Sequence, residues 1–162
     1  MSIVLDINHA MISYYRNDPR RVFHFTKVHA LCRLIALSEN IEEKTLQILE
    51  IAALMHDIGI KISEMKYHSS AGNYQQTEGP PEAMKILDEL GVATDVSERV
   101  CYLIGHHHTY KEISGIDYQI LIEADFLVNA YEEEMNAAQI VSMRKLFRTQ
   151  TGSALLEKLY SF

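Results

Sequence analysis

Side chains that bind metals occur at three places on otherwise apolar segments of the sequence. A histidine lies in RRVFHFTKV, a His-Asp pair ends IAALMHD, and an aspartate interrupts ILIEADFLV. An ionised carboxylate is costly to bury unless it is paired or binds a cation. Imidazole and carboxylate ligands together suit Mn, Fe, Co, Ni or Zn better than Ca. The pattern therefore predicts a divalent metal site with the ligands His24, His56, Asp57 and Asp125.

The surroundings of the two aspartates favour a cation over an ion pair. No basic residue lies within one helical turn of Asp125, and the basic residue nearest to Asp57 is Lys61. Neighbouring residues of a helix diverge by about 100°, so His56 and Asp57 can share an ion only where the helix ends at a cavity. The purely structural alternatives are a helix C-terminus at this pair and a hydrogen bond from Asn129 to Asp125.

A run of three histidines closes the apolar segment VCYLIGHHH. It fits a solvated helix end, a set of ligands for a second metal, or groups that bind phosphate and donate protons. We favour His106 and His107 for the functional roles, because His108 begins the following loop. Lys61 is either a phosphate contact or an ordinary surface lysine.

Helical periodicity dominates the elements that must position these residues. Apolar residues recur at spacings of three and four, and no pair of strands with a hairpin turn is evident. The sequence therefore predicts an all-α fold of about eight helices. They cover residues 2–15, 20–38, 41–56, 80–91, 95–105, 117–133, 136–147 and 153–160.

Residues 58–79 have neither helical nor strand periodicity and contain three glycines with several Ser and Asn. We expect a long loop here, followed by a helix that begins at Pro80. Its place directly after the His-Asp pair suggests that it forms a wall or lid of a substrate site, with His68 and Tyr74 as residues that could close over a ligand. The acidic run 132–134 is expected to be a solvated surface.

Composition limits the class of protein. The 162 residues are 48% hydrophobic and 23% charged, which is typical of a single soluble domain with a substantial core. The net charge of −7 gives no electrostatic basis for binding a nucleic acid polymer. No signal peptide or membrane span is evident. Cys32 and Cys101 are isolated among apolar residues, as expected for buried thiols in a cytoplasmic protein.

The motifs, taken in order, resemble those of the HD-domain superfamily of metal-dependent phosphohydrolases. The resemblance covers about residues 20–130 and includes ALMHDIG, GPPEAMKILDELG, the LIGHHH segment and EADFLVN. It implies a single all-α bundle over residues 1–162, with the helices of 136–160 packed on the motif region. It also implies a buried divalent ion, of Mn, Fe, Co, Ni, Zn or Mg, held by His24, His56, Asp57 and Asp125.

Two departures from the family pattern bear on the number of metals and on phosphate binding. Members with two metals usually carry a further His just before the Pro of the next helix, and Gly79 stands there, with Glu78 as a neighbour that could substitute. Many members have a Lys directly after the His-Asp-Ile-Gly motif, whereas here Ile60 precedes Lys61. We therefore expect one metal.

The resemblance implies hydrolysis of a phosphoester in a small molecule, with nucleotides as the leading substrate class. A bound divalent ion can polarise a phosphoryl oxygen and activate a water molecule. Asp57 would accept the proton of that water, while Lys61, His106 and His107 would neutralise charge or protonate the leaving group. The alternatives are a di-iron oxygenase of the HD type and a non-catalytic metal-binding or regulatory module. A homodimer is possible.

Overall fold

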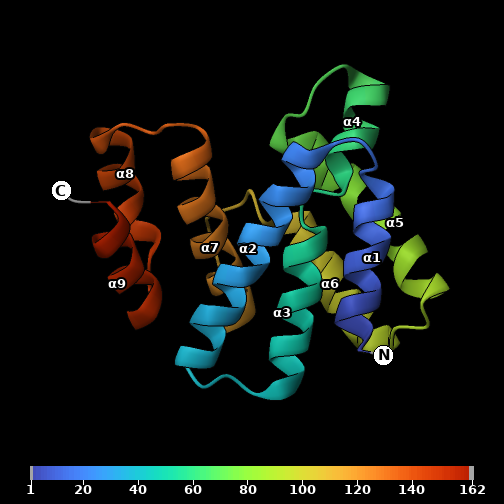
Figure 1. Ribbon diagram of the computed structural model, residues 1–162, viewed down its shortest axis with the longest axis horizontal. Helices are drawn as coiled ribbons and strands as arrows, with labels where there is room; N and C mark the ends of the chain where they lie inside the picture. Colours follow the sequence, from blue (N-terminus) through green and yellow to red (C-terminus); the bar gives the residue numbers. More distant parts are fainter. Residues whose placement is uncertain (1, 161–162) are drawn as a thin grey trace.

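The computed structural model describes residues 2–160 and contains only helices and their connections within that range (Figure 1). The all-α prediction is confirmed. Most helix ends lie within one or two residues of the expected positions, as is usual for boundaries drawn from periodicity. The elements are α1 (Ile3–Tyr14), α2 (Pro19–Ser38), α3 (Glu43–Met55), α4 (Gly59–Tyr67), α5 (Gly72–Glu89), α6 (Thr94–His106), α7 (Ile116–Glu132), α8 (Ala137–Met143), the 3₁₀ turn η1 (Arg144–Leu146) and α9 (Gln150–Leu159).

Helices α2, α3 and α7 form the centre of the molecule. Figure 1 shows them with α1 and α5 on one side and α8 and α9 on the other. Helix α3 packs against α1, α2, α6 and α7, and its residues 48–55 are all buried. Residues 117–128 of α7 are buried without interruption. Because these stretches are buried on all sides, they form the core, and polar groups on them are removed from bulk water.

The first turn of α2 is fixed by a capping interaction. The side chain of Asp18 accepts a hydrogen bond from the backbone N of Arg21 at 3.2 Å, and Pro19 occupies the first helical position. Both features are typical of helix N-termini, since Asp satisfies a free N–H and Pro lacks one. This start places Arg20, Arg21 and His24 in the first two turns of the helix.

The prediction of a long loop over residues 58–79 is wrong. The segment forms α4 and the first turns of α5, and only residues 68–71 connect them. The glycines serve a close helix crossing instead of turns: a Cβ atom on Gly59 would lie 2.5 Å from the Gln75 carbonyl oxygen and 2.8 Å from the backbone N of Gly79. Pro80 and Pro81, expected at a helix start, lie inside α5.

A buried carboxylate joins the C-terminal helices to α7. The fully buried Glu123 of α7 accepts hydrogen bonds from the backbone N atoms of Arg148 and Thr149, at 2.6 and 3.0 Å. The hydroxyl of Thr149 also donates to Glu123 and caps the start of α9 by accepting from Gly152 N. This network packs α9 against the helix that carries Asp125.

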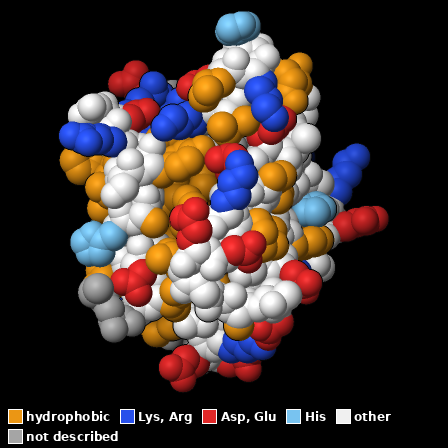
Figure 2. Space-filling model, turned by 90° about the vertical axis from the view of Figure 1, so that its right-hand side faces the viewer, with side chains coloured by type: hydrophobic (Ala, Val, Ile, Leu, Met, Phe, Trp, Pro, Cys, Tyr) orange, Lys and Arg blue, Asp and Glu red, His pale blue; other side chains and the backbone are white. Residues whose placement is uncertain are grey.

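The surface carries charges of both signs. Figure 2 shows the side formed by α1, α4 and α5, where acidic and basic side chains are mixed with hydrophobic patches. Among the described residues, none of the helices has the length and hydrophobicity that a membrane crossing requires. The two cysteines are free, with Cys32 buried and Cys101 partly buried.

The crossing of α4 and α5 predicts an unusual sensitivity at Gly59. We expect Gly59→Ala to lower the free energy of unfolding by about 1–3 kcal/mol, because the new methyl group meets backbone atoms that must move apart. Urea unfolding measures this change. Gly105→Ala is the control, since its Cβ would come no closer than 3.3 Å to Pro80 and Ala favours a helix. Equal stability of the two variants would contradict the tight crossing.

Candidate metal centre

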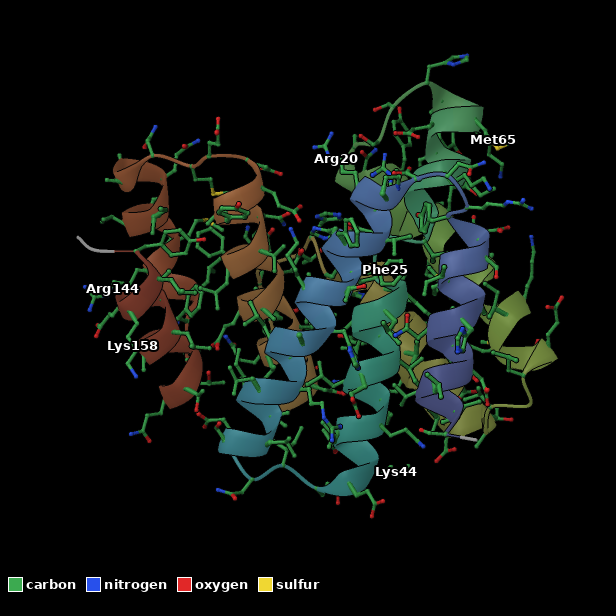
Figure 3. The ribbon with its side chains drawn as sticks, viewed as in Figure 1. Arg20, Phe25, Lys44, Met65, Arg144 and Lys158 are labelled. Atoms are coloured by element: carbon green, nitrogen blue, oxygen red, sulfur yellow. The ribbon has the colours of Figure 1, made fainter. Side chains whose placement is uncertain are left out.

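The four predicted ligands meet where α2, α3 and α7 converge. The Nε2 atoms of His24 and His56 lie 3.1 Å apart, and Asp57 Oδ2 is 3.3 Å from the first and 3.5 Å from the second. Asp125 Oδ1, from the middle of α7, lies at the same distances from the two nitrogens. Phe25, the residue after His24, is labelled between α2 and α3 in Figure 3 and marks this region.

Hydrogen bonds on the far side of each imidazole orient its Nε2 atom. The Nδ1 of His24 lies 2.8 Å from Glu132 Oε2, and the Nδ1 of His56 lies 2.8 Å from the Ala53 carbonyl oxygen. Both partners only accept, so each Nδ1 carries the proton and each neutral ring presents a lone pair at Nε2. Two imidazole nitrogens, each with a lone pair when its ring is neutral, and two carboxylate oxygens therefore point at one another. This donor set fits a divalent cation, which interacts favourably with all four.

Without a metal, protons must supply the positive charge. Burial lowers the pKa of His56, but Asp57 and Asp125 outweigh burial and raise it to about 9. Burial raises the pKa of Asp125, but its bonds to His24 and His56 hold the pKa well below the usual range. The cluster therefore favours protonated imidazoles in the metal-free protein, and a divalent ion must displace those protons.

A second group of potential ligands adjoins the first. The Nδ1 of His107 donates to the Ile104 carbonyl at 2.8 Å, which directs its Nε2 toward Asp57 Oδ1 at 3.4 Å. This buried Nε2 has no hydrogen-bond partner among the described residues. His108 belongs to the same group, whose ligand atoms lie within 4.8 Å of one another. Asp57 thus faces both groups, one with each carboxylate oxygen.

Helix α5 faces this second group through Gln75. Its Oε1 lies 3.0 Å from His108 Nε2. Gly79, one turn later, instead lies at the crossing with α4, where a Cβ would meet the Ile104 side chain at 2.7 Å. Glu78 is bonded to Lys66 and Tyr67 near the surface, away from the cluster. In this structure, Gln75 is therefore the residue of α5 that contacts the second group of ligands, whereas Gly79 packs at the helix crossing.

Several other candidate residues lie away from the ligands. Lys61 Nζ donates to the Tyr14 carbonyl at 3.2 Å and sits over the Tyr14 ring. His106 donates from Nδ1 to the Tyr102 carbonyl at 2.7 Å and stacks on the Tyr102 ring. Tyr74 stacks on Tyr67, with ring centroids 4.2 Å apart. His68, also placed in the predicted loop, ends α4 in a left-handed conformation.

A cavity of about 340 Å³ opens over the cluster of candidate metal ligands. Arg20 and Arg21 from α2 line it, together with Gln75 and His108. Arg21 forms ion pairs with Asp18 and Glu64. Arg20, in contrast, is exposed and has no ion pair among residues 2–160. Figure 3 shows Arg20 at the upper end of α2, near the α4–α5 connection. The segment 58–79 therefore does form one wall of this cavity, through Ile58, Ile60, Ser70, Gly72 and Gln75.

Sequence reasoning missed Arg20 and Glu132, although spacing held a signal for each. Arg20 precedes His24 by four residues, and Glu132 follows Asp125 by seven, so each shares a helix face with a ligand. Glu132 was expected on a solvated surface. Instead its side chain, 17% exposed, bonds to His24 and to Lys27 Nζ at 2.6 Å. Burial raises its pKa, but the bonds from Lys27 and His24 outweigh burial and lower it.

Comparisons with known proteins agree with this geometry. The family model described as HD domain matches residues 21–143. Among solved structures, the chain is similar to a predicted HD superfamily hydrolase from an uncultured Thermotogales bacterium, with 25% sequence identity and a TM-score of 0.72. That alignment covers 97% of this chain and 84% of the other. The comparison with curated proteins found no significant match.

The raised pKa of His56 predicts how the metal-free protein responds to pH. A group whose pKa is higher in the folded state stabilises it fully below the unfolded value of 6.5, and that stabilisation is lost as the pH rises to about 9. We expect the melting temperature of chelator-treated protein to fall over this interval. Added Mn²⁺ should reverse the loss, with a larger effect at higher pH. A flat melting temperature without metal would contradict this charge assignment.

Proposed function

Because the chain belongs to the HD-domain family, we propose that it is a metal-dependent phosphohydrolase that cleaves a phosphoester of a small molecule, with a nucleotide as the leading substrate class. The observation that carries this proposal is the convergence of two imidazole lone pairs and two carboxylates beneath a cavity. Similarity to a predicted hydrolase of the same superfamily supports it.

The ligand residues would hold the ion and leave one side of it open to the cavity. A divalent ion supplies polarisation of a phosphoryl oxygen and a lowered pKa of water. Asp57 has the most exposed side chain of the four ligands, at 21%, whereas His24 and Asp125 are 10% exposed and His56 is fully buried. Asp57 is therefore the ligand nearest to solvent, and we assign it the role of accepting the proton of the attacking water.

Arg20 supports the binding of an anionic substrate. It lines the cavity, and its guanidinium is free to form charge-assisted hydrogen bonds with phosphoryl oxygens. This local positive charge reconciles a phosphorylated substrate with the overall charge of −7. A volume of about 340 Å³ is near the lower limit for small-molecule sites, which favours a small phosphoester over a polymer.

Removing the carboxylate that faces both ligand groups tests the proposed activity. We expect Asp57→Asn to lose its bound metal and at least about 100-fold in turnover, since the amide is a weaker ligand and base. Metal content and phosphate release should be measured with Mn²⁺ on nucleoside mono-, di- and triphosphates and sugar phosphates. Asp88→Asn, on the exposed side of α5, is the control. Full metal content in Asp57→Asn would overturn the ligand assignment.

Arg20 and Lys61 are competing candidates for the phosphate contact. We expect Arg20→Ala to raise KM by about 10-fold or more with unchanged metal content, because a hydrogen bond to a charged group contributes about 1.5–3 kcal/mol. Lys61→Ala should change KM by less than about 2-fold, since its ammonium binds Tyr14 outside the cavity. Steady-state kinetics on the best substrate of the panel distinguish them. A larger effect at Lys61 would favour the sequence-based assignment.

The second ligand group keeps one rival function open to test. Asp57, His107 and His108 could hold a second ion, as a di-iron oxygenase requires. Two irons per chain with consumption of dioxygen would favour that function, whereas phosphate release with any divalent ion would favour hydrolysis. A metal-binding chain without turnover on the panel would point to a regulatory module.

A further inference from the structure

Glu132 connects the metal cluster to the surface of α2. Its Oε2 accepts the hydrogen bond from His24 Nδ1 at 2.8 Å, and its Oε1 accepts from Lys27 Nζ at 2.6 Å. Glu132 is the last residue of α7, and both partners belong to α2. The carboxylate therefore ties the two helices together directly behind a predicted ligand.

The spacing along α7 places this carboxylate on the same face as a ligand. Asp125, Asn129 and Glu132 are separated by four and three residues, so they lie one above the other along the helix. Asn129 Nδ2 donates to Asp125 Oδ1 at 3.0 Å. One face of α7 thus supplies a ligand, an amide that orients that ligand, and a carboxylate that contacts a ligand of the neighbouring helix.

We propose that Glu132 is a positioning residue of the metal centre, which holds His24 in the tautomer and ring orientation that direct the Nε2 lone pair at the ion. A carboxylate accepts only, so the ring must place its proton on Nδ1 to make this bond. Lys27 balances the charge of Glu132 and holds it in place. The inference rests on the proposed metal centre but not on hydrolysis, because ion binding can be measured without substrate.

Two substitutions at Glu132 separate the hydrogen bond from general effects of charge or packing. In Glu132→Ala, His24 loses its acceptor and the ring is free to turn or to protonate Nε2. In Glu132→Gln, the amide oxygen can still accept from Nδ1. Glu89→Gln is the matched control, because Glu89 is also the last residue of a helix, α5, and is exposed.

Titration of metal-free protein with Co²⁺ tests the proposal, since its visible absorption reports both affinity and coordination. We expect Glu132→Ala to weaken Co²⁺ binding by about 10–100-fold and to alter the spectrum at saturation. Glu132→Gln should recover most of the affinity and the wild-type spectrum. The control should bind Co²⁺ within about 2-fold of wild type.

Several outcomes would overturn the positioning role. Glu132→Ala with Co²⁺ affinity within about 3-fold of wild type and the same spectrum would do so. Equal losses in the Ala and Gln variants with unchanged spectra would reduce Glu132 to a source of negative charge. If the Ala variant does not fold, as judged by thermal melting, the Gln variant decides, because a loss as large as 10-fold there would refute the retained hydrogen bond. If the wild-type protein binds Co²⁺ but releases no phosphate from any substrate, that result would count against the proposed hydrolase activity and not against the positioning role of Glu132.

Discussion

The structure depends on a concentration of negative charge and lone pairs at the centre of a helical bundle. Asp57 and Asp125 are removed from most solvent, and within residues 2–160 the polar partners of their carboxylates are imidazole nitrogens and one amide. Other buried carboxylates have further partners that need no metal: Glu50 bonds to Arg33 as well as to His29, and Glu123 accepts from backbone N–H groups. These two aspartates have a positively charged partner only while the histidines hold their extra protons, which are lost as the pH rises to about 9, whereas a bound divalent cation would supply the positive charge at higher pH as well.

That requirement explains why the central helices carry polar residues at particular points. The His-Asp pair follows the last residue of α3, where adjacent side chains can reach one ion. Asp125 comes from the buried middle of α7, and His24 from the second turn of α2. Around them lies an apolar core that excludes water and strengthens each electrostatic interaction. The same helices supply the groups that hydrogen-bond to the far side of the ligands, so the packing of these helices determines the geometry of the site.

The α4–α5 pair shows how backbone packing shapes the cavity. Gly59 and Gly79 allow the two helices to touch, and the contact brings Gln75 next to His108. Gly72 adds a similar close approach, since a Cβ there would lie 2.9 Å from the His108 ring. Small residues in this segment therefore set the distance between α5 and His108, which follows α6. Their number made the segment resemble a loop when judged by composition alone.

The sequence by itself determined the all-α class, most helix ends and the four residues that meet at the cluster, because apolar periodicity and the cost of burying charge are local properties. Tertiary structure decided which polar groups face the cavity. It placed Arg20 and Glu132 at the cavity and directed Lys61 and His106 away from it, because the direction of a side chain depends on how the helices cross. It also placed residues 58–79 in helices. The sequence alone does not distinguish a glycine that permits a close backbone contact from a glycine that permits a turn.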